Sequence, residues 1–444
     1  MDLGAAERDA VDLLERLCRR PSVSAEGGAL AETADLVEGL LRDAGFETRQ
    51  LVVDGAPPAV WGELHGTGGR TVLLYNHYDV QPADPLELWE TPPFEPAIRD
   101  GRLYARGAAD NKAQIALRLA ALHALGGSPP VTIRWIIEGE EEVGSPHFDE
   151  LVRGNVELLR ADGCLWEGSG FRPDGRPEFV LGVKGVLAVR LDLGLLSGDA
   201  HSGSAAVVPS AAWRLVDALT CLKEPAGRIR VAGFYAPVRQ PTPGELAAIA
   251  EQSPTADDEL RKAYGVREFV DGVSGEELRR RLSLEPTCNL AGFHTGYGGP
   301  GVKTVLPARA SAWLDFRLVP DQHPSEVLDQ VRAHLDAHGF GEVEITKLAS
   351  AEPAMTPLDD PFAARAIAVA ERLAGKPASI VPSAAGTLPI VAPLQQHVGL
   401  PGLSAPDNAV YGGCSAHAPN EHIRLEDLGP ALRYFEALLE ELGS

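Results

Sequence analysis

The chain has 444 residues, of which 44% are hydrophobic and 23% are charged, a composition typical of a globular protein large enough for two domains. Its formal net charge of −23 argues against nucleic acid or an anionic membrane surface as a partner. No apolar run approaches the ~18 residues of a membrane span, and the N-terminal segment lacks the apolar centre of a signal peptide. The sequence contains five cysteines, none in a Cys-x-x-Cys pair, so we predict no disulfide framework and a reducing, cytoplasmic location. They are Cys18, Cys164, Cys221, Cys288 and Cys414.

The first part of the chain alternates predicted helices with predicted strands, which indicates a doubly wound α/β sheet flanked by helices. Amphipathic spacing predicts helices, and short apolar or alternating runs predict strands. The helices are expected at 5–20, 29–45 and 110–125, and the strands at 47–53, 58–64, 71–75 and 131–138.

From about residue 186 the pattern changes to strand, helix, strand, helix, strand, which predicts a small α+β sandwich inserted into the first domain. Strands are expected at 186–195, 308–319 and 341–348, and helices at 208–222, 255–282 and 324–338, with a glycine-rich loop at 292–301. The helix–strand pattern of the first domain then resumes. We therefore predict a catalytic domain formed by 1–185 and 353–444, and an inserted domain formed by 186–352.

Acids and histidines follow the predicted sheet strands, where open α/β folds place their ligand crevices. His77 and Asp79 come directly after the strand at 71–75, so the carboxylate can orient the imidazole. Asp110 stands where a loop becomes a helix; it either caps the helix or bridges two cations. Considered alone, each of these residues also fits a structural role.

The strand at 131–138 ends in Glu138-Gly-Glu-Glu-Glu-Val-Gly144, with four acids within five residues. Such acids repel one another unless a cation compensates them, although a solvated acidic loop is the alternative. Glu167 follows another short apolar strand, and His417 lies in a loop of small residues. Histidine and carboxylate ligands without thiolates suit hydrolytic zinc, with manganese or cobalt as substitutes.

Together, His77-Tyr-Asp79, Arg106-Gly-Ala-Ala-Asp110, Glu138-Gly-Glu-Glu141 and His417 resemble the signature of one metallopeptidase family. Its members include aminoacylase, carboxypeptidase G, carnosinase-like dipeptidases, acetylornithine deacetylase and succinyl-diaminopimelate desuccinylase. The resemblance implies two zinc ions per subunit and an inserted domain that serves as lid and dimerisation domain. It also implies the following roles: His77 and Glu167 bind one metal, Glu141 and His417 the other, Asp110 bridges them, Asp79 orients His77, and Glu140 is the general base.

The resemblance further implies substrate-binding residues. His201 would reach the active site of a partner subunit, and Arg317 would hold the terminal carboxylate of the substrate, a task that suits a planar guanidinium. Asn289 would line the same pocket, and Gly386 and Thr387 would contact the carboxylate. Many relatives have Glu-Gly-Gly-Ser where this chain has Ala384-Ala-Gly-Thr387, which would leave that end of the pocket less negative.

Three functions remain open at this point. The first is hydrolysis of dipeptides or short peptides by a homodimer of the carnosinase-like branch, and the second is hydrolysis of N-acyl amino acids by the same mechanism. The third is a metal-stabilised binding protein that has lost catalysis. We expect lid closure about hinges at 182–185 and 352–357.

Overall fold

The computed structural model describes residues 2–225, 227–252, 256–411 and 413–444. Within these ranges, no helix combines the length and the apolar character that a membrane crossing requires.

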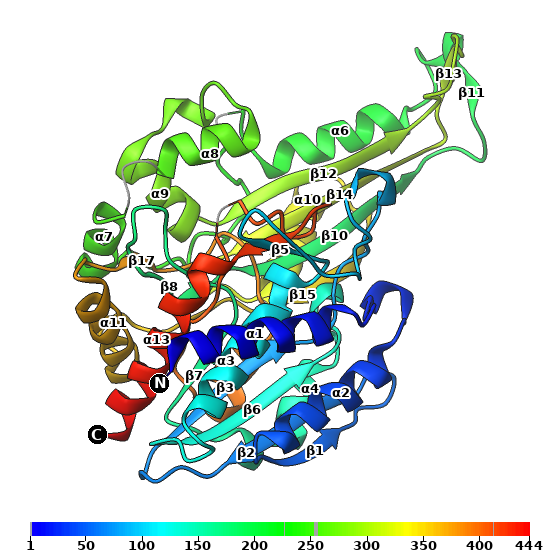
Figure 1. The fold of residues 1–444 in the computed structure, drawn as a ribbon. Coiled ribbons are helices and arrows are strands. Elements are labelled where there is room, and N and C mark those ends of the chain that lie inside the picture. Colours follow the sequence, from blue (N-terminus) through cyan, green and yellow to red (C-terminus); the bar gives the residue numbers. More distant parts are fainter. Residues whose placement is uncertain (1, 226, 253–255, 412) are drawn as a thin grey trace.

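An eight-stranded mixed sheet forms the centre of the larger part of the molecule (Figure 1), with strand order β1-β2-β6-β3-β7-β18-β8-β17. The strand β3 pairs in parallel with both β6 and β7, whereas β1 and β2 extend the sheet in antiparallel fashion at one edge. The strands are β1 (Glu47–Leu51), β2 (Ala59–Leu64), β3 (Thr71–His77), β6 (Thr132–Glu138), β7 (Gly163–Trp166), β8 (Glu178–Val180), β17 (Ser379–Val381) and β18 (Gly402–Ser404).

Helices cover both faces of this sheet, as the alternating sequence predicts. Successive residues of β3 point to opposite faces, so Leu74 packs into one core, whereas Leu73 and Tyr75 pack into another. The first core contains residues from α1 (Leu3–Cys18), α2 (Leu30–Asp43), α3 (Ala113–Ala124), α11 (Pro361–Ala374) and α13 (Leu428–Gly443). The second contains residues from α4 (Phe148–Gly154), α5 (Val156–Leu159) and α12 (Val391–Pro393). Burial on both faces explains why β3 and β6 read as continuous apolar runs.

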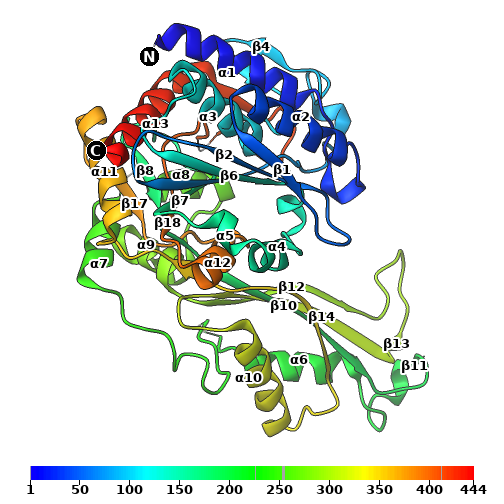
Figure 2. The same ribbon diagram turned by 90° about the horizontal axis from the view of Figure 1, so that it is seen from below.

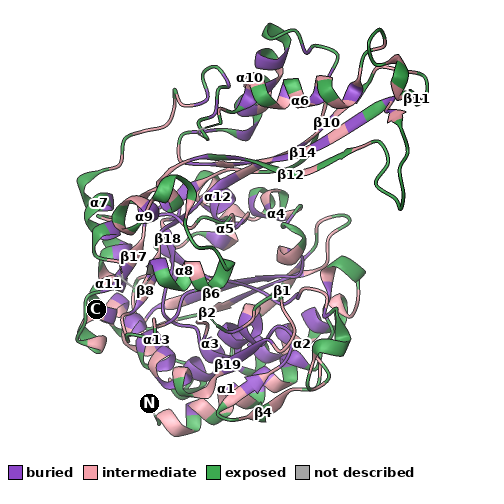
Figure 3. Ribbon diagram, turned by 90° about the horizontal axis from the view of Figure 1, so that it is seen from above, coloured by how far each residue is buried: buried purple, intermediate pink, exposed green. Residues whose placement is uncertain are grey.

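The second sheet is antiparallel and has the order β12-β14-β10-β15 (Figure 2). Its strands are β10 (Gly185–Gly194), β12 (Thr287–Thr295), β14 (Arg309–Leu318) and β15 (Glu344–Ala351). Along β10 the buried residues alternate, and Leu187, Val189 and Leu191 pack beneath α6 (Ala211–Leu222) and α10 (Pro324–Ala337). This sandwich has its own core, and Figure 3 shows that its far end is largely exposed.

Two short strands join the two parts of the molecule. β9 (Gly182–Val183) pairs with β16 (Ala354–Met355), which places both crossings of the chain side by side at the predicted hinges. The helices α7 (Pro243–Ala250), α8 (Ala256–Tyr264) and α9 (Gly275–Leu284) lie near the larger sheet, and Gln252 Nε2 donates to the carbonyl of Ile380 in β17 at 2.9 Å. The domain boundaries stay a prediction.

Two predicted elements differ in the structure. The helix expected over 255–282 is divided into α8 and α9, and residue 255 lies outside the described residues. Gly265, with a φ of 64°, follows α8 directly in the left-handed conformation that ends helices. The strand β12 begins before the glycine-rich segment and extends into it, because pairing with β14 outweighs the weak strand preference of Gly292.

Candidate metal centre and active site

Three parallel strands bring side chains to one edge of the large sheet. β3 ends at His77, β6 ends at Glu138, and Glu167 directly follows β7. Because these strands are neighbours, their carboxyl ends meet at one edge, the position where open α/β sheets bind ligands.

The first group of donor atoms is centred on the buried ring of His77. Its Nε2 lies 3.1 Å from Oδ1 of Asp110 and 3.0 Å from Oε2 of Glu167. Its Nδ1 donates to the backbone carbonyl of Asp79 at 3.1 Å, which leaves Nε2 as the ligand atom. Burial opposes protonation of this ring, but the carboxylates of Glu167, Asp110 and Asp79 outweigh it and raise the pKa of His77 well above its usual value.

The second group is centred on His417. Its Nε2 lies 3.0 Å from Oδ2 of Asp110 and 3.1 Å from Oε2 of Glu142. Asp110 therefore divides its two oxygens between the two imidazoles. This is the arrangement of a carboxylate that bridges two cations.

These donor groups fit two divalent ions. Donors bound to one tetrahedral zinc ion lie roughly 3.3 Å apart, close to the spacing of each group here. Glu167 Oε2 is buried beside His77 Nε2 and has no other polar partner among the described residues. The crowding of carboxylates is also electrostatically costly: burial, followed by the charge of Glu167, raises the pKa of Glu141 to about 9. Two cations would remove this cost.

Asp79 connects the two halves of the site. Besides orienting His77, its Oδ1 and Oδ2 accept the backbone N–H groups of Glu141 at 3.2 Å and of Glu142 at 3.1 Å. Asp79 thus fixes both the imidazole and the acidic turn after β6.

The structure corrects the assignments within the glutamate cluster. Glu140 does not reach the centre: its carboxylate accepts the backbone N–H of His147 at 2.9 Å and lies 2.9 Å from the Nδ1 of that ring. Glu141 was expected to contact His417, but Glu142 occupies that place. The charges of Glu167, His77, Glu142 and Asp110 act on Glu141, whose carboxyl group belongs to neither donor group.

The physical reason for this shift of one residue is a turn. β6 ends at Glu138, and the chain then folds into a short 3-10 turn over Glu141–Val143, in which Gly144 N–H donates to the carbonyl of Glu141 at 2.7 Å. The rotation at this turn, which strand alternation does not describe, decides where each consecutive glutamate points.

Glu421 is a residue that the sequence analysis missed. Its buried carboxylate accepts Arg106 Nη1 at 2.7 Å and the backbone N–H groups of Gly107, Ala109 and Asp110 at 2.8, 2.8 and 3.0 Å. It therefore holds the loop that presents Asp110. The one signal for it in the sequence is an acid four residues after His417.

Three of the predicted substrate-binding residues lie together. Arg317 Nη1 donates to Oγ1 of Thr387 at 2.7 Å, and Thr387 Oγ1 donates to the carbonyl of Lys184 at 2.6 Å. The N–H of Lys184 in turn donates to the carbonyl of Gly386 at 3.0 Å. The guanidinium of Arg317 forms no ion pair with any described carboxylate, so it is available to an anionic group.

The other two predicted substrate-binding residues, Asn289 and His201, lie elsewhere in the inserted domain. Asn289, on β12, donates to Oδ2 of Asp315 at 2.8 Å, two residues from Arg317 on β14. His201 ends the short strand β11 (Ala200–His201) at the exposed tip of the inserted domain, far from the large sheet in Figure 1. Its Nδ1 accepts the N–H of Gly203, and within one chain it does not approach the donor groups.

A third group of possible ligands, Cys221, His334 and His338, lies in the inserted domain. His334 Nε2 donates to the carbonyl of Cys221 at 3.0 Å, and His338 Nδ1 donates to the carbonyl of His334 at 2.8 Å. The first bond fastens α10 to α6, the second lies at the end of α10, and together they assign the group a structural role.

The chain is similar to known metallopeptidases. The chain resembles the M20 family metallo-carboxypeptidase Sso-CP2 from Sulfolobus solfataricus, with 35% identity, a TM-score of 0.91, and 98% of this chain and 99% of that chain covered. It is 30% identical to the Cys-Gly metallodipeptidase dug1 of Schizosaccharomyces pombe over 73% of this chain and 72% of that protein. It is 29% identical to the Beta-Ala-His dipeptidase of Rattus norvegicus, with 67% of this chain covered but 62% of the length of the rat protein.

The fold and the paired donor groups define a metal-dependent hydrolase of the α/β class. The model of peptidase family M20/M25/M40 matches residues 73–441, and the chain belongs to this family. It is therefore a metallopeptidase, and the resemblance noted in its motifs is confirmed.

Proposed function

We propose that the chain holds two zinc ions, for which manganese or cobalt can substitute, and uses them to hydrolyse the amide bond of dipeptides or short peptides. His77, Asp110 and Glu167 would hold one ion, and Asp110, Glu142 and His417 the other. The chemistry that such a pair supplies is the activation of a water and the polarisation of the scissile carbonyl. The observation that carries the proposal is the division of the two Asp110 oxygens between His77 and His417.

In this proposal Glu141 is the general base. It is subject to the charges of both donor groups, is not one of the proposed metal ligands, and its backbone N–H donates to Asp79. An uncoordinated carboxylate so placed takes a proton from the attacking water and returns it to the departing amine. Asp79 keeps both Glu141 and His77 in position.

The terminal carboxylate of the substrate would bind Arg317, with Thr387, Gly386 and Asn289 around it. A guanidinium oriented by a hydroxyl offers the planar donors that a carboxylate requires. A second candidate substrate is an N-acyl amino acid, which the apolar Ala384 favours, because a free α-ammonium group would find no acid at that position.

The test is turnover of a dipeptide panel and an N-acetyl amino acid panel by the metal-free protein reconstituted with zinc, manganese or cobalt. Release of amino acids that depends on metal and on Glu141 supports the proposal. Peptide-induced shifts in melting temperature without any turnover would instead support the third candidate, a binding protein that has lost catalysis.

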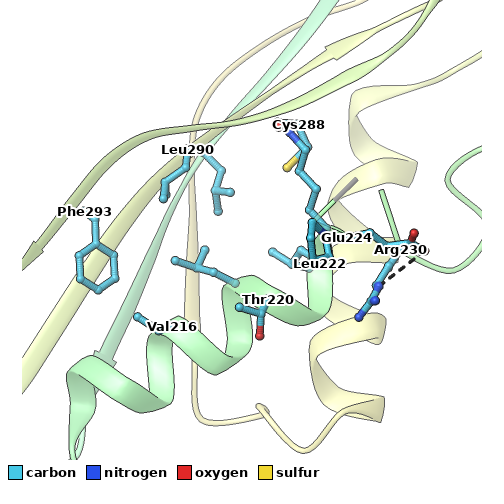
Figure 4. A pocket seen from close by; sticks show the side chains of 12 residues that line it. Val216, Thr220, Leu222, Glu224, Arg230, Cys288, Leu290 and Phe293 are labelled. Atoms are coloured by element: carbon cyan, nitrogen blue, oxygen red, sulfur yellow. Dashed lines mark hydrogen bonds and ion pairs between the residues drawn. The ribbon is translucent and has the colours of Figure 1, made fainter. Parts of the chain in front are cut away.

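We also propose a homodimer formed through the inserted domain, with a second copy of the chain as the occupant of an apolar hollow. Figure 4 shows this hollow between α6 and β12, with Val216, Leu290 and Phe293 in its wall. Its volume is about 640 Å³. Among the described strands β12 pairs with β14 alone, so its outer edge is free for another strand. Trp213 precedes Val216 by three residues on α6, and its side chain is 72% exposed. A large apolar side chain so exposed suits burial in an interface. Light scattering tests the assembly.

In such a dimer His201, at the exposed tip of the inserted domain, would reach the active site of the partner subunit. There it would stabilise the negative charge that develops on the oxygen of the scissile carbonyl. We further propose that 186–352 closes as a lid about the paired strands β9 and β16.

The five free cysteines, four of them buried, support a cytoplasmic location, which fractionation of cells would test.

A further inference from the structure

A buried arginine of α3 contacts the strands that end in the metal centre. Arg118 is fully buried, and its Nε donates to Oδ2 of the equally buried Asp407 at 2.8 Å. Replacing such a buried ion pair by apolar side chains is often neutral or stabilising, because both charges lose their water on burial. The stability of the fold alone therefore explains this pair poorly.

Arg118 lies where two strands of the large sheet separate. The last paired residues of β3 and β7 are Leu74 and Leu165, after which β3 continues beside β6 and β7 beside β18. Arg118 Nη1 donates to the carbonyl of Tyr75 in β3 at 2.9 Å. Its Nη2 donates to the carbonyls of Leu165 and Trp166 in β7 at 3.4 and 3.3 Å. The guanidinium thus joins the two strands where their own ladder of hydrogen bonds has ended.

Both strands carry a ligand of the first donor group directly beyond these contacts. Arg118 Nη1 also donates to Oδ1 of Asn76 at 2.7 Å, and His77 is the next residue. Glu167 directly follows Trp166, and its Oε2 lies 3.0 Å from Nε2 of His77. Because the guanidinium is rigid and planar, its bonds to both strands fix the distance between the two ligands.

Side-chain amides extend the same support to Asp110. Asn111, the residue after Asp110, donates through Nδ2 to Oε1 of Gln114 at 3.1 Å. Gln114 Nε2 in turn donates to Oδ1 of Asp407 at 2.7 Å. Asp407 therefore binds Arg118 with one oxygen and, through Gln114, the residue that follows Asp110 with the other. All three ligands proposed for one ion depend on this buried network of Arg118, Asp407, Gln114 and Asn111.

The second donor group lacks this support. In the described part of the chain, the residues next to Glu142 and His417 make no hydrogen bond to the buried network. We propose that Arg118 is a positioning residue for the first ion alone, the one assigned to His77, Asp110 and Glu167. This inference rests on the proposed function, which supplies the two ions, and adds that their binding depends on different parts of the chain.

The test is Arg118→Lys, studied by zinc titration of the metal-free full chain against a chelating competitor. Lysine keeps a positive charge beside Asp407, but a single ammonium group cannot bridge both strands with planar donors. We expect one of the two ions to bind about 10- to 100-fold more weakly, as is usual when a group that orients metal ligands is lost. The other ion should bind with the affinity of the parent.

Arg134→Lys is the matched control, because the guanidinium of Arg134 also donates to two backbone carbonyls, those of Glu157 and Arg160. It should leave both affinities unchanged. Asp407→Asn removes the charge that holds Arg118 and should weaken the same ion, so the test does not depend on the folding of one variant. Melting temperatures of the metal-free variants show that they are folded.

The variant Glu167→Ala identifies which ion is affected. It removes a ligand of the first ion, so adding Arg118→Lys to it should not weaken the ion that remains. Weakening of that remaining ion, equal weakening of both ions in Arg118→Lys, or no change in either would overturn the inference and leave the proposed function intact. A parent that binds two ions but releases no amino acid from any substrate would overturn the proposed function alone. A parent that binds fewer than two ions would overturn both.

Discussion

The backbone N–H of Asp110 donates to Oε1 of Glu421 at 3.0 Å, so an acid outside the donor groups fixes the residue that joins them. The second oxygen of Glu421 accepts Arg106 and the N–H of Gly107, which holds the rest of the same loop. Metal centres depend on such supporting groups, because these groups set the direction of each ligand.

We therefore expect Glu421→Gln to lower metal affinity or activity about 10- to 100-fold, since an amide cannot accept all four bonds. Zinc content after dialysis and kcat/KM at saturating zinc measure the two effects. Glu440→Gln, at an exposed position on the C-terminal helix, is a control for the loss of one negative charge. Unchanged affinity and activity in the Glu421 variant would contradict the supporting role.

The second prediction separates the adjacent glutamates. Glu141→Gln should lower kcat by about 10²- to 10⁴-fold while the protein still binds two metal ions, because the base is lost and the ligands remain. Glu140→Gln should have a much smaller effect on kcat, since Glu140 binds His147. If Glu140→Gln proved the more damaging change at full metal content, our correction would be wrong.

Much of this site could be predicted because apolar runs mark where strands end. His77, Glu138 and Glu167 stand at the ends of β3, β6 and β7, and parallel neighbours bring their ends together whatever the details of packing. The doubly wound fold follows from the same alternation of helices and strands.

The remaining features depend on geometry that no local pattern contains. Three consecutive glutamates after β6 are chemically equal in the sequence, and the turn at 141–143 alone decides that Glu142 meets His417. Glu421 acts through backbone groups more than 300 residues away in the chain. His201 lacks its proposed partner within one chain, because that role requires a second subunit.

The third prediction concerns pH. In the metal-free protein, burial and then the charge of Glu167 raise the pKa of Glu141 from 4.5 to about 9, and hydrogen bonds to Asp110 and Glu142 raise that of His417 from 6.5 to about 10. The folded state therefore holds protons that the unfolded state releases over these intervals. The free energy of unfolding should fall as pH rises from about 6.5 to 9.

Metal ions replace these protons, so the metal-loaded protein should show a weaker dependence on pH over the same interval. Thermal melts in EDTA and in zinc, at steps of half a pH unit, measure the difference. A melting temperature of the metal-free protein that rises from pH 6.5 to 9 would contradict the electrostatic account of the site.

The last prediction tests whether His201 serves the partner subunit. His201→Ala should lower kcat and leave the dimer intact, because His201 lies at an exposed tip and bonds within its own turn. Co-expression of His201→Ala with Glu141→Gln should then give a mixed dimer that is more active than either variant alone. In the mixed dimer, the chain that retains Glu141 receives His201 from the other chain. A mixed dimer, isolated with two different affinity tags, that is no more active than its parents would show that His201 does not act across the interface.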